Sequence, residues 1–157
     1  MKVKALLYSD GSERSLSAAL YAAGLMKGIP GLELTLISLA GVPRGPLGLT
    51  RDEEAASAEV LSRVSKDIIQ ETKKIFDQRQ IKVDTVIGTS GTGTVAATIA
   101  KYARDGNYNL IIMGTRGPTD LKALVAGSLA HAVVRAAPCP VLLVKKLPEE
   151  ILASLGE

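Results

Sequence analysis

Residues 114–128, GTRGPTDLKALVAGS, form the stretch that decides the predicted fold and the predicted site. They follow the apolar segment 108–114, which predicts a strand buried on both faces of a parallel sheet. Gly114, at the end of that strand, would allow a turn with positive φ and let a ligand approach the backbone closely. Gly127 and Ser128 begin the next helical pattern, and the first amides of a helix attract phosphate. The stretch therefore predicts a strand, a phosphate-binding loop and a helix, in that order.

Strand and helix patterns alternate along the whole chain, which is typical of a parallel sheet covered by helices. We expect five strands, at residues 3–9, 32–39, 81–88, 108–114 and 141–146, with a helix between each strand and the next. The second of these helices should open with Thr50 and Glu53 in capping-box register. One side of it should be apolar, carrying Val60, Val64, Ile68 and Ile75.

The composition excludes several classes of protein. With 157 residues, 46% of them hydrophobic and 22% charged, the chain predicts one folded domain rather than a disordered segment. The net charge of +3 comes from scattered basic residues without interleaved aromatics, so we expect no nucleic-acid partner. Charged residues and prolines interrupt the most apolar region, 121–144, so we expect no membrane span. The single cysteine, Cys139, and an N-terminus without a signal-peptide pattern favour the cytoplasm.

The glycine spacing resembles a family signature. Gly114, Gly117 and, nine residues further on, Gly127 with Ser128 match the nucleotide-binding signature of the universal stress protein family. The segments YSDGSERSLSAA, LIIMGTRG and APCPVLLV are similar to other parts of that family, in the same order. The resemblance covers residues 1–146, and only the tail 147–157 lies outside it.

The resemblance implies a single α/β domain with a Rossmann-like, adenine nucleotide alpha hydrolase-like three-layer sandwich. Its parallel sheet would have five strands in the order 3-2-1-4-5, so that the first and fourth strands are neighbours. The family likeness also implies ATP as ligand, with Mg²⁺ held mainly by the phosphates, and a homodimer formed through the fifth strand, Val141 to Val144.

The resemblance further implies a role for each matching residue. Asp10 would lie near the adenosine, and the main chain of Leu39 would contact adenine. The ribose and phosphates would be lined by Gly114 and Gly117. Phosphate would be held by Gly127, Ser128 and the amide of Leu129. Arg116 either reaches phosphate oxygens or is a solvated loop cation.

The sequence departs from the family pattern at three places. Ala130 stands where ATP-binding members usually carry a second hydroxyl residue, which removes one phosphate donor. The turn after the third strand, often Gly-x-Pro in the family, is Gly88-Thr89-Ser90 here, and Ser38 replaces a usual histidine.

Each signal also has a purely structural interpretation. The glycines can shape a tight turn, Asp10 or Ser12 can cap the first helix, and Cys139 can be a core thiol. The segment 91–96, GTGTVA, matches a degenerate dinucleotide pattern, but a helix start is the better interpretation because no acidic residue ends a following strand.

We expect a binding protein rather than an efficient enzyme. His131 is the only histidine, so a catalytic triad has one possible base and no evident nucleophile elbow, and a histidine-rich metal site is excluded. The leading hypothesis is a homodimeric stress-response module that responds to ATP, with no catalytic residue assigned. The alternatives are a slow ATPase or self-phosphorylating protein that uses the same site, and an interaction protein that has lost nucleotide binding.

Overall fold

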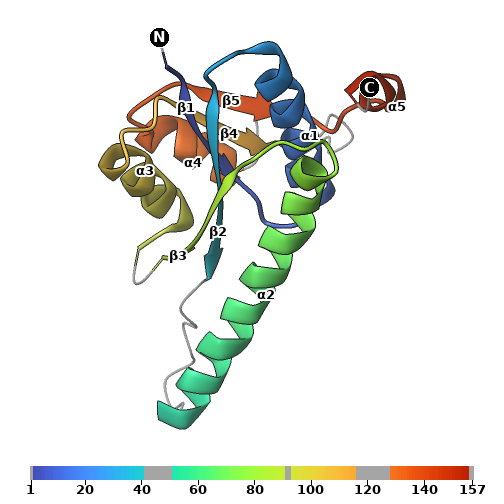
Figure 1. Ribbon diagram of the computed structural model, residues 1–157. Coiled ribbons are helices and arrows are strands. Elements are labelled where there is room, and N and C mark those ends of the chain that lie inside the picture. Colours follow the sequence, from blue (N-terminus) through green and yellow to red (C-terminus); the bar gives the residue numbers. More distant parts are fainter. Residues whose placement is uncertain (1, 41–50, 91–92, 116–127, 156–157) are drawn as a thin grey trace.

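The computed structural model describes residues 2–40, 51–90, 93–115 and 128–155. Strands and helices alternate along them as the sequence predicts (Figure 1). The elements are β1 (Lys4–Tyr8), α1 (Glu13–Gly28), β2 (Glu33–Ala40), α2 (Arg51–Asp77), β3 (Asp84–Thr89), α3 (Val95–Asp105), β4 (Leu110–Gly114), α4 (Ser128–Ala136), β5 (Val141–Val144) and α5 (Glu149–Leu155).

The five strands form one parallel sheet in the order β3-β2-β1-β4-β5, which confirms the predicted fold class and strand order. β1 lies in the centre, between β2 and β4, and the register pairs Leu7 with Ile112 of β4. The order reverses between β1 and β4, because the chain first builds the sheet toward β3 and then returns to the other side of β1. This switch point is where parallel α/β sheets bind ligands.

Alternation along β1 divides the core into two layers. Ala5 and Leu7 face the helices α1 and α2 and join the cluster that contains Phe76. Leu6 and Tyr8 face the other way and pack with residues of α3 and α4, Ile99 and Val133 among them. Side chains that alternate between faces therefore give a three-layer sandwich, with the sheet between two pairs of helices (Figure 1).

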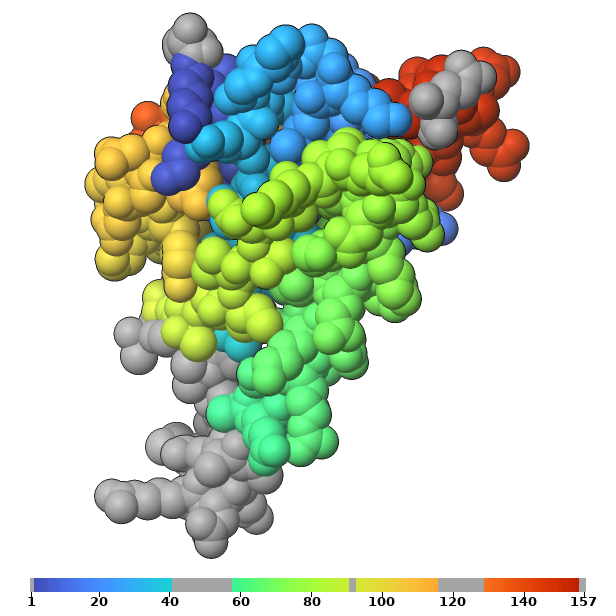
Figure 2. Space-filling model, in the orientation of Figure 1, coloured from blue at the N-terminus to red at the C-terminus, as the bar shows by residue number. Residues whose placement is uncertain are grey.

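The apolar side of α2 is not buried in the N-terminal half of the helix. Val60 and Val64 are 55% and 48% exposed. The reason is that the part of α2 that carries them extends beyond the sheet, as Figures 1 and 2 show, so these two side chains do not reach the core. The side that packs on the core begins later and carries Ser65, Ile69, Thr72 and Phe76. The predicted capping residue Thr50 lies outside the described residues.

Two strands begin more than one residue later than their sequence patterns suggest. β3 starts at Asp84 rather than residue 81, because a turn after α2 uses the Ile81 amide for a 2.9 Å bond to the Phe76 carbonyl. β4 starts at Leu110 rather than residue 108, because the Tyr108 amide bonds to the Ala103 carbonyl at the end of α3. In both places, backbone amides that the pattern assigns to a strand close the preceding helix instead.

The C-terminal segment returns to α1. The Leu147 amide lies 3.4 Å from the Ser17 hydroxyl, and the Leu147 side chain packs against the α1 layer of the core. α5 follows and contacts α1, with Leu155 placed over Gly24. None of the helices among the described residues is long and apolar enough to span a membrane.

Candidate functional site

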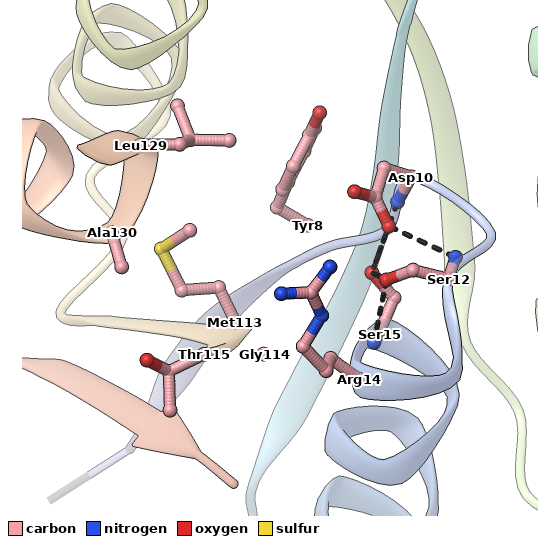
Figure 3. A pocket seen from close by; sticks show the side chains of 10 residues that line it. All are labelled: Tyr8, Asp10, Ser12, Arg14, Ser15, Met113, Gly114, Thr115, Leu129 and Ala130. Carbon is pink, nitrogen blue, oxygen red and sulfur yellow. Dashed lines mark hydrogen bonds between the residues drawn. The ribbon is translucent and has the colours of Figure 1, made fainter. Parts of the chain in front are cut away.

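A pocket opens at the switch point, where the carboxyl ends of β1 and β4 lie side by side (Figure 3). The residues that line it come from these two strand ends, from the start of α1 and from the start of α4. They are Tyr8, Asp10, Ser12, Arg14, Ser15, Met113, Gly114, Thr115, Leu129 and Ala130.

Asp10 lies in the turn from β1 to α1, and two serines of that turn fix its carboxylate. Its Oδ1 accepts hydrogen bonds from the Ser12 amide at 2.9 Å and the Ser15 hydroxyl at 2.6 Å. Partial burial raises the pKa of Asp10, but the hydrogen bonds from Ser12 and Ser15 outweigh it and hold that pKa below its ordinary value. The carboxylate is therefore charged at neutral pH and can accept hydrogen bonds from ligand hydroxyl groups.

The helix α1 is capped by Ser12 rather than by Asp10. The Ser12 side chain accepts a hydrogen bond from the Ser15 amide, and its backbone is extended, as an N-cap residue requires. Of the two capping residues that the sequence suggests, Ser12 thus caps the helix. Asp10 organises the turn and faces the pocket (Figure 3).

Arg14 brings a positive charge into the pocket from the first turn of α1. Figure 3 shows its guanidinium directed into the space between Tyr8, Met113 and Asp10. Sequence reasoning missed this residue, although it stands four positions after Asp10, where the start of a helix should bring its side chain near the preceding turn. A guanidinium presents several N–H donors and suits a phosphate or carboxylate.

Gly114 is required by packing rather than by a turn. A Cβ on Gly114 would lie 2.5 Å from the carbonyl carbon and 2.6 Å from the carbonyl oxygen of Arg14. The positive φ expected at Gly114 is wrong, since the described glycines with positive φ are Gly11 and Gly31. The absent side chain lets the first turn of α1 rest on the end of β4, which places Arg14 in the pocket.

Tyr8 and Met113 form the walls of the pocket at the two strand ends. Burial, and then the nearby charge of Asp10, raise the pKa of Tyr8 to about 12. Tyr8 therefore keeps its proton at neutral pH and offers a ring face and a hydroxyl group. Both side chains belong to the same core layer. Because alternate residues of a strand point to the same face, the sequence could have predicted that these two side chains lie together, and this was not used.

The α4 side of the pocket is mainly apolar in its described side chains. Ser128 is the first residue of α4, and the side chains of Leu129 and Ala130 line the pocket. Ala130, the departure from the family pattern, is 3% exposed and leaves no hydroxyl at that position. Thr115, the residue after β4, supplies a hydroxyl near this side (Figure 3).

Of the site residues predicted from the sequence, the structure places Asp10, Gly114 and Leu129 around the pocket. Leu39 lies near the end of β2, where its side chain contacts the Gly88 and Tyr102 region, and it does not line the pocket. Three further predicted residues lie outside the described residues, namely Arg116, Gly117 and Gly127. The lining residues that sequence reasoning missed are Tyr8, Arg14, Ser15, Met113 and Thr115.

Comparisons with known proteins agree with this fold. The model of the universal stress protein family matches residues 4–145. Universal stress protein MJ0531 of Methanocaldococcus jannaschii is 31% identical over 147 residues, which are 94% of this chain and 84% of the relative. The solved structure of hypothetical protein MJ0577, from the same organism, is 27% identical with a TM-score of 0.72, and the match covers 94% of this chain and 98% of that one. A structure of the universal stress protein from Archaeoglobus fulgidus in complex with dAMP is 19% identical with a TM-score of 0.61, covering 92% and 98% of the two chains.

The fold and the switch-point pocket define a Rossmann-like α/β protein. The match over most of the chain identifies the group within this class: the chain belongs to the universal stress protein family.

Proposed function

We propose that this protein binds ATP in the switch-point pocket and acts in the cytoplasm as a homodimeric stress-response module whose state depends on the nucleotide. The observation that carries the proposal is the distribution of charge around the pocket. Asp10 lies at one side, the N-terminus of α4 at the other, and Arg14 between them (Figure 3). A ligand with hydroxyl groups at one end and phosphates at the other fits this arrangement.

The chemistry of each group supports a nucleotide. The Asp10 carboxylate suits ribose hydroxyls and would repel phosphate, whereas Arg14 and the first amides of α4 suit phosphate oxygens. The apolar walls, Tyr8 and Met113, offer contact area to a sugar or a base. The dAMP complex of a protein with the same fold supports an adenine nucleotide as ligand. Mg²⁺, in this proposal, is held mainly by the phosphates and adds charge neutralisation when bound.

The test is a calorimetric titration of Mg-ATP into protein shown by absorbance to be free of nucleotide. We expect saturable binding near one ATP per chain and weaker binding of GTP. Adenosine should bind more weakly than ATP, because it has no phosphates to contact the protein. The variant Arg14→Gln should weaken ATP binding about tenfold, because a charge-assisted hydrogen bond to phosphate is lost, and leave adenosine binding unchanged.

The matched control is Arg104→Gln, which removes the same charge from an exposed position in the last turn of α3. This variant should bind ATP as the wild type does. The absence of heat and of saturation with millimolar ATP would contradict the proposal. Equal loss of affinity in both variants would show that Arg14 acts through net charge alone.

A further inference from the structure

The Thr115 hydroxyl is a buried polar group without a hydrogen-bond partner among the described residues. Thr115 follows directly after β4, its amide bonds to the Val144 carbonyl at 2.9 Å, and the residue is 7% exposed. Its amide is thus satisfied by the sheet, while its hydroxyl group is buried from water and has no partner in the part of the chain that the structure describes. A buried hydroxyl without a partner makes the folded protein less stable than a hydroxyl whose hydrogen bond is made.

The position of Thr115 suggests that a ligand in the pocket is the missing hydrogen-bond partner of its hydroxyl. The residue lines the pocket, and its hydroxyl points to the side where Ala130 of α4 lies (Figure 3). The described side chains on that side, Leu129 and Ala130, carry no hydrogen-bonding group, so a ligand there would meet the Thr115 hydroxyl without competition from them. Rotation about χ1 carries the hydroxyl between staggered positions and can turn it to the ligand.

The surroundings also decide which kind of group the hydroxyl would meet. The N-terminus of α4 carries the positive end of the helix dipole and has amides without intrahelical partners. The Arg14 guanidinium lines the same pocket. An acceptor that lies between an arginine and a helix N-terminus should be anionic, and phosphate is the anion that this combination favours.

We infer that Thr115 is a phosphate-binding residue whose hydroxyl, without a partner among the described residues, is satisfied by the ligand. The inference rests on the proposed nucleotide function and adds a residue that neither the glycine signature nor the position of Ala130 indicates. It implies that the ligand-free protein gives up stability at Thr115 and that ligand binding recovers it.

The test compares Thr115→Val, which replaces the hydroxyl by a methyl group of similar size, with Thr115→Ser, which keeps the hydroxyl. Without ligand, Thr115→Val should unfold in urea at the same or a higher concentration than the wild type, because no hydrogen bond is lost. In calorimetry it should bind Mg-ATP about tenfold more weakly and adenosine equally well. Thr115→Ser should bind Mg-ATP within a few-fold of the wild type.

Either of two results would overturn the assignment of Thr115. A clear loss of stability in ligand-free Thr115→Val would show that the hydroxyl serves the folded protein itself. Unchanged ATP affinity in Thr115→Val, with the wild type binding ATP, would show that the hydroxyl does not reach the phosphates. A wild type that binds no ATP would instead overturn the proposed function, and the Thr115 inference would fall with it.

Discussion

At the scale of single residues, Gly114 combines a packing constraint with a position that lines the pocket. Gly114 belongs to a glycine signature that suggests ligand binding, yet its immediate contact is the backbone of Arg14. The two interpretations combine, because the close approach of α1 to β4 is what carries the Arg14 side chain into the pocket. The sequence alone identifies the glycine, but it does not show that the Arg14 backbone packs against it.

We predict that Gly114→Ala lowers the free energy of unfolding by about 1–3 kcal/mol, since the new Cβ meets backbone atoms that cannot move aside easily. It should also weaken ATP binding by displacing Arg14. The control is Gly28→Ala at the end of α1, where an added Cβ meets no atom within 4 Å. That variant should be neutral or more stable by up to about 1 kcal/mol. Urea unfolding measures both, and equal stability of the two variants would contradict the packing argument.

At the scale of elements, α2 is connected to the pocket by buried hydrogen bonds. The Thr72 hydroxyl donates to the Ile68 carbonyl at 2.7 Å, so it must accept from the Ser9 hydroxyl, which lies 3.0 Å away. The Ser9 hydroxyl in turn accepts from the Gly11 amide at 3.3 Å. Gly11 follows Asp10 directly, so the C-terminal half of α2 holds the turn that presents Asp10 to the pocket.

Replacing Thr72 by valine should destabilise the protein by about 1–3 kcal/mol, because the fully buried Ser9 hydroxyl loses its acceptor. The double variant Ser9→Ala with Thr72→Val should recover much of this loss, since both buried hydroxyls are then absent and the amide of Gly11, an exposed residue, can bond to water. A double-mutant cycle in urea measures the coupling. Strictly additive effects of the two substitutions would show that the hydrogen bond does not connect the elements.

At the scale of the whole molecule, β5 leaves one edge of the sheet without a neighbour among the described residues. The carbonyl of Pro140 accepts a hydrogen bond from the Ile111 amide of β4, and that of Val144 from the amide of Thr115, directly after β4. The alternation of a strand therefore turns the amide of Leu143 away from β4. A homodimer formed through this strand, as we propose, would use such outward amides and would cover an edge that otherwise favours aggregation.

The substitution Leu143→Pro removes the outward amide, whereas Leu143→Ala removes only the side chain and keeps the amide. We therefore expect sedimentation velocity at micromolar concentration to show a monomer for Leu143→Pro and a dimer for Leu143→Ala and the wild type. Circular dichroism should show both variants folded. A monomeric wild type, or a dimer that persists in Leu143→Pro, would contradict pairing through β5.

The order of the elements and the class of the sheet follow from the sequence by itself, because the periodicity of apolar residues is a local property. The segments around Leu6, Ile37 and Ile112 are predicted as strands from their own residues, the last of them as a buried strand, and the glycines mark the segment that follows it in the same way. The position of Asp10 is likewise predictable, since it directly follows the strand predicted at residues 3–9.

Only the tertiary structure decides which elements meet and how closely. The exposure of Val60 and Val64, the contact of Gly114 with Arg14 and the burial of the Thr115 hydroxyl depend on neighbours that are distant in the sequence. The physical reason is that a crossover fixes which strands are adjacent, but the reach of a helix beyond the sheet and the satisfaction of each buried polar group depend on the packed arrangement of all the layers.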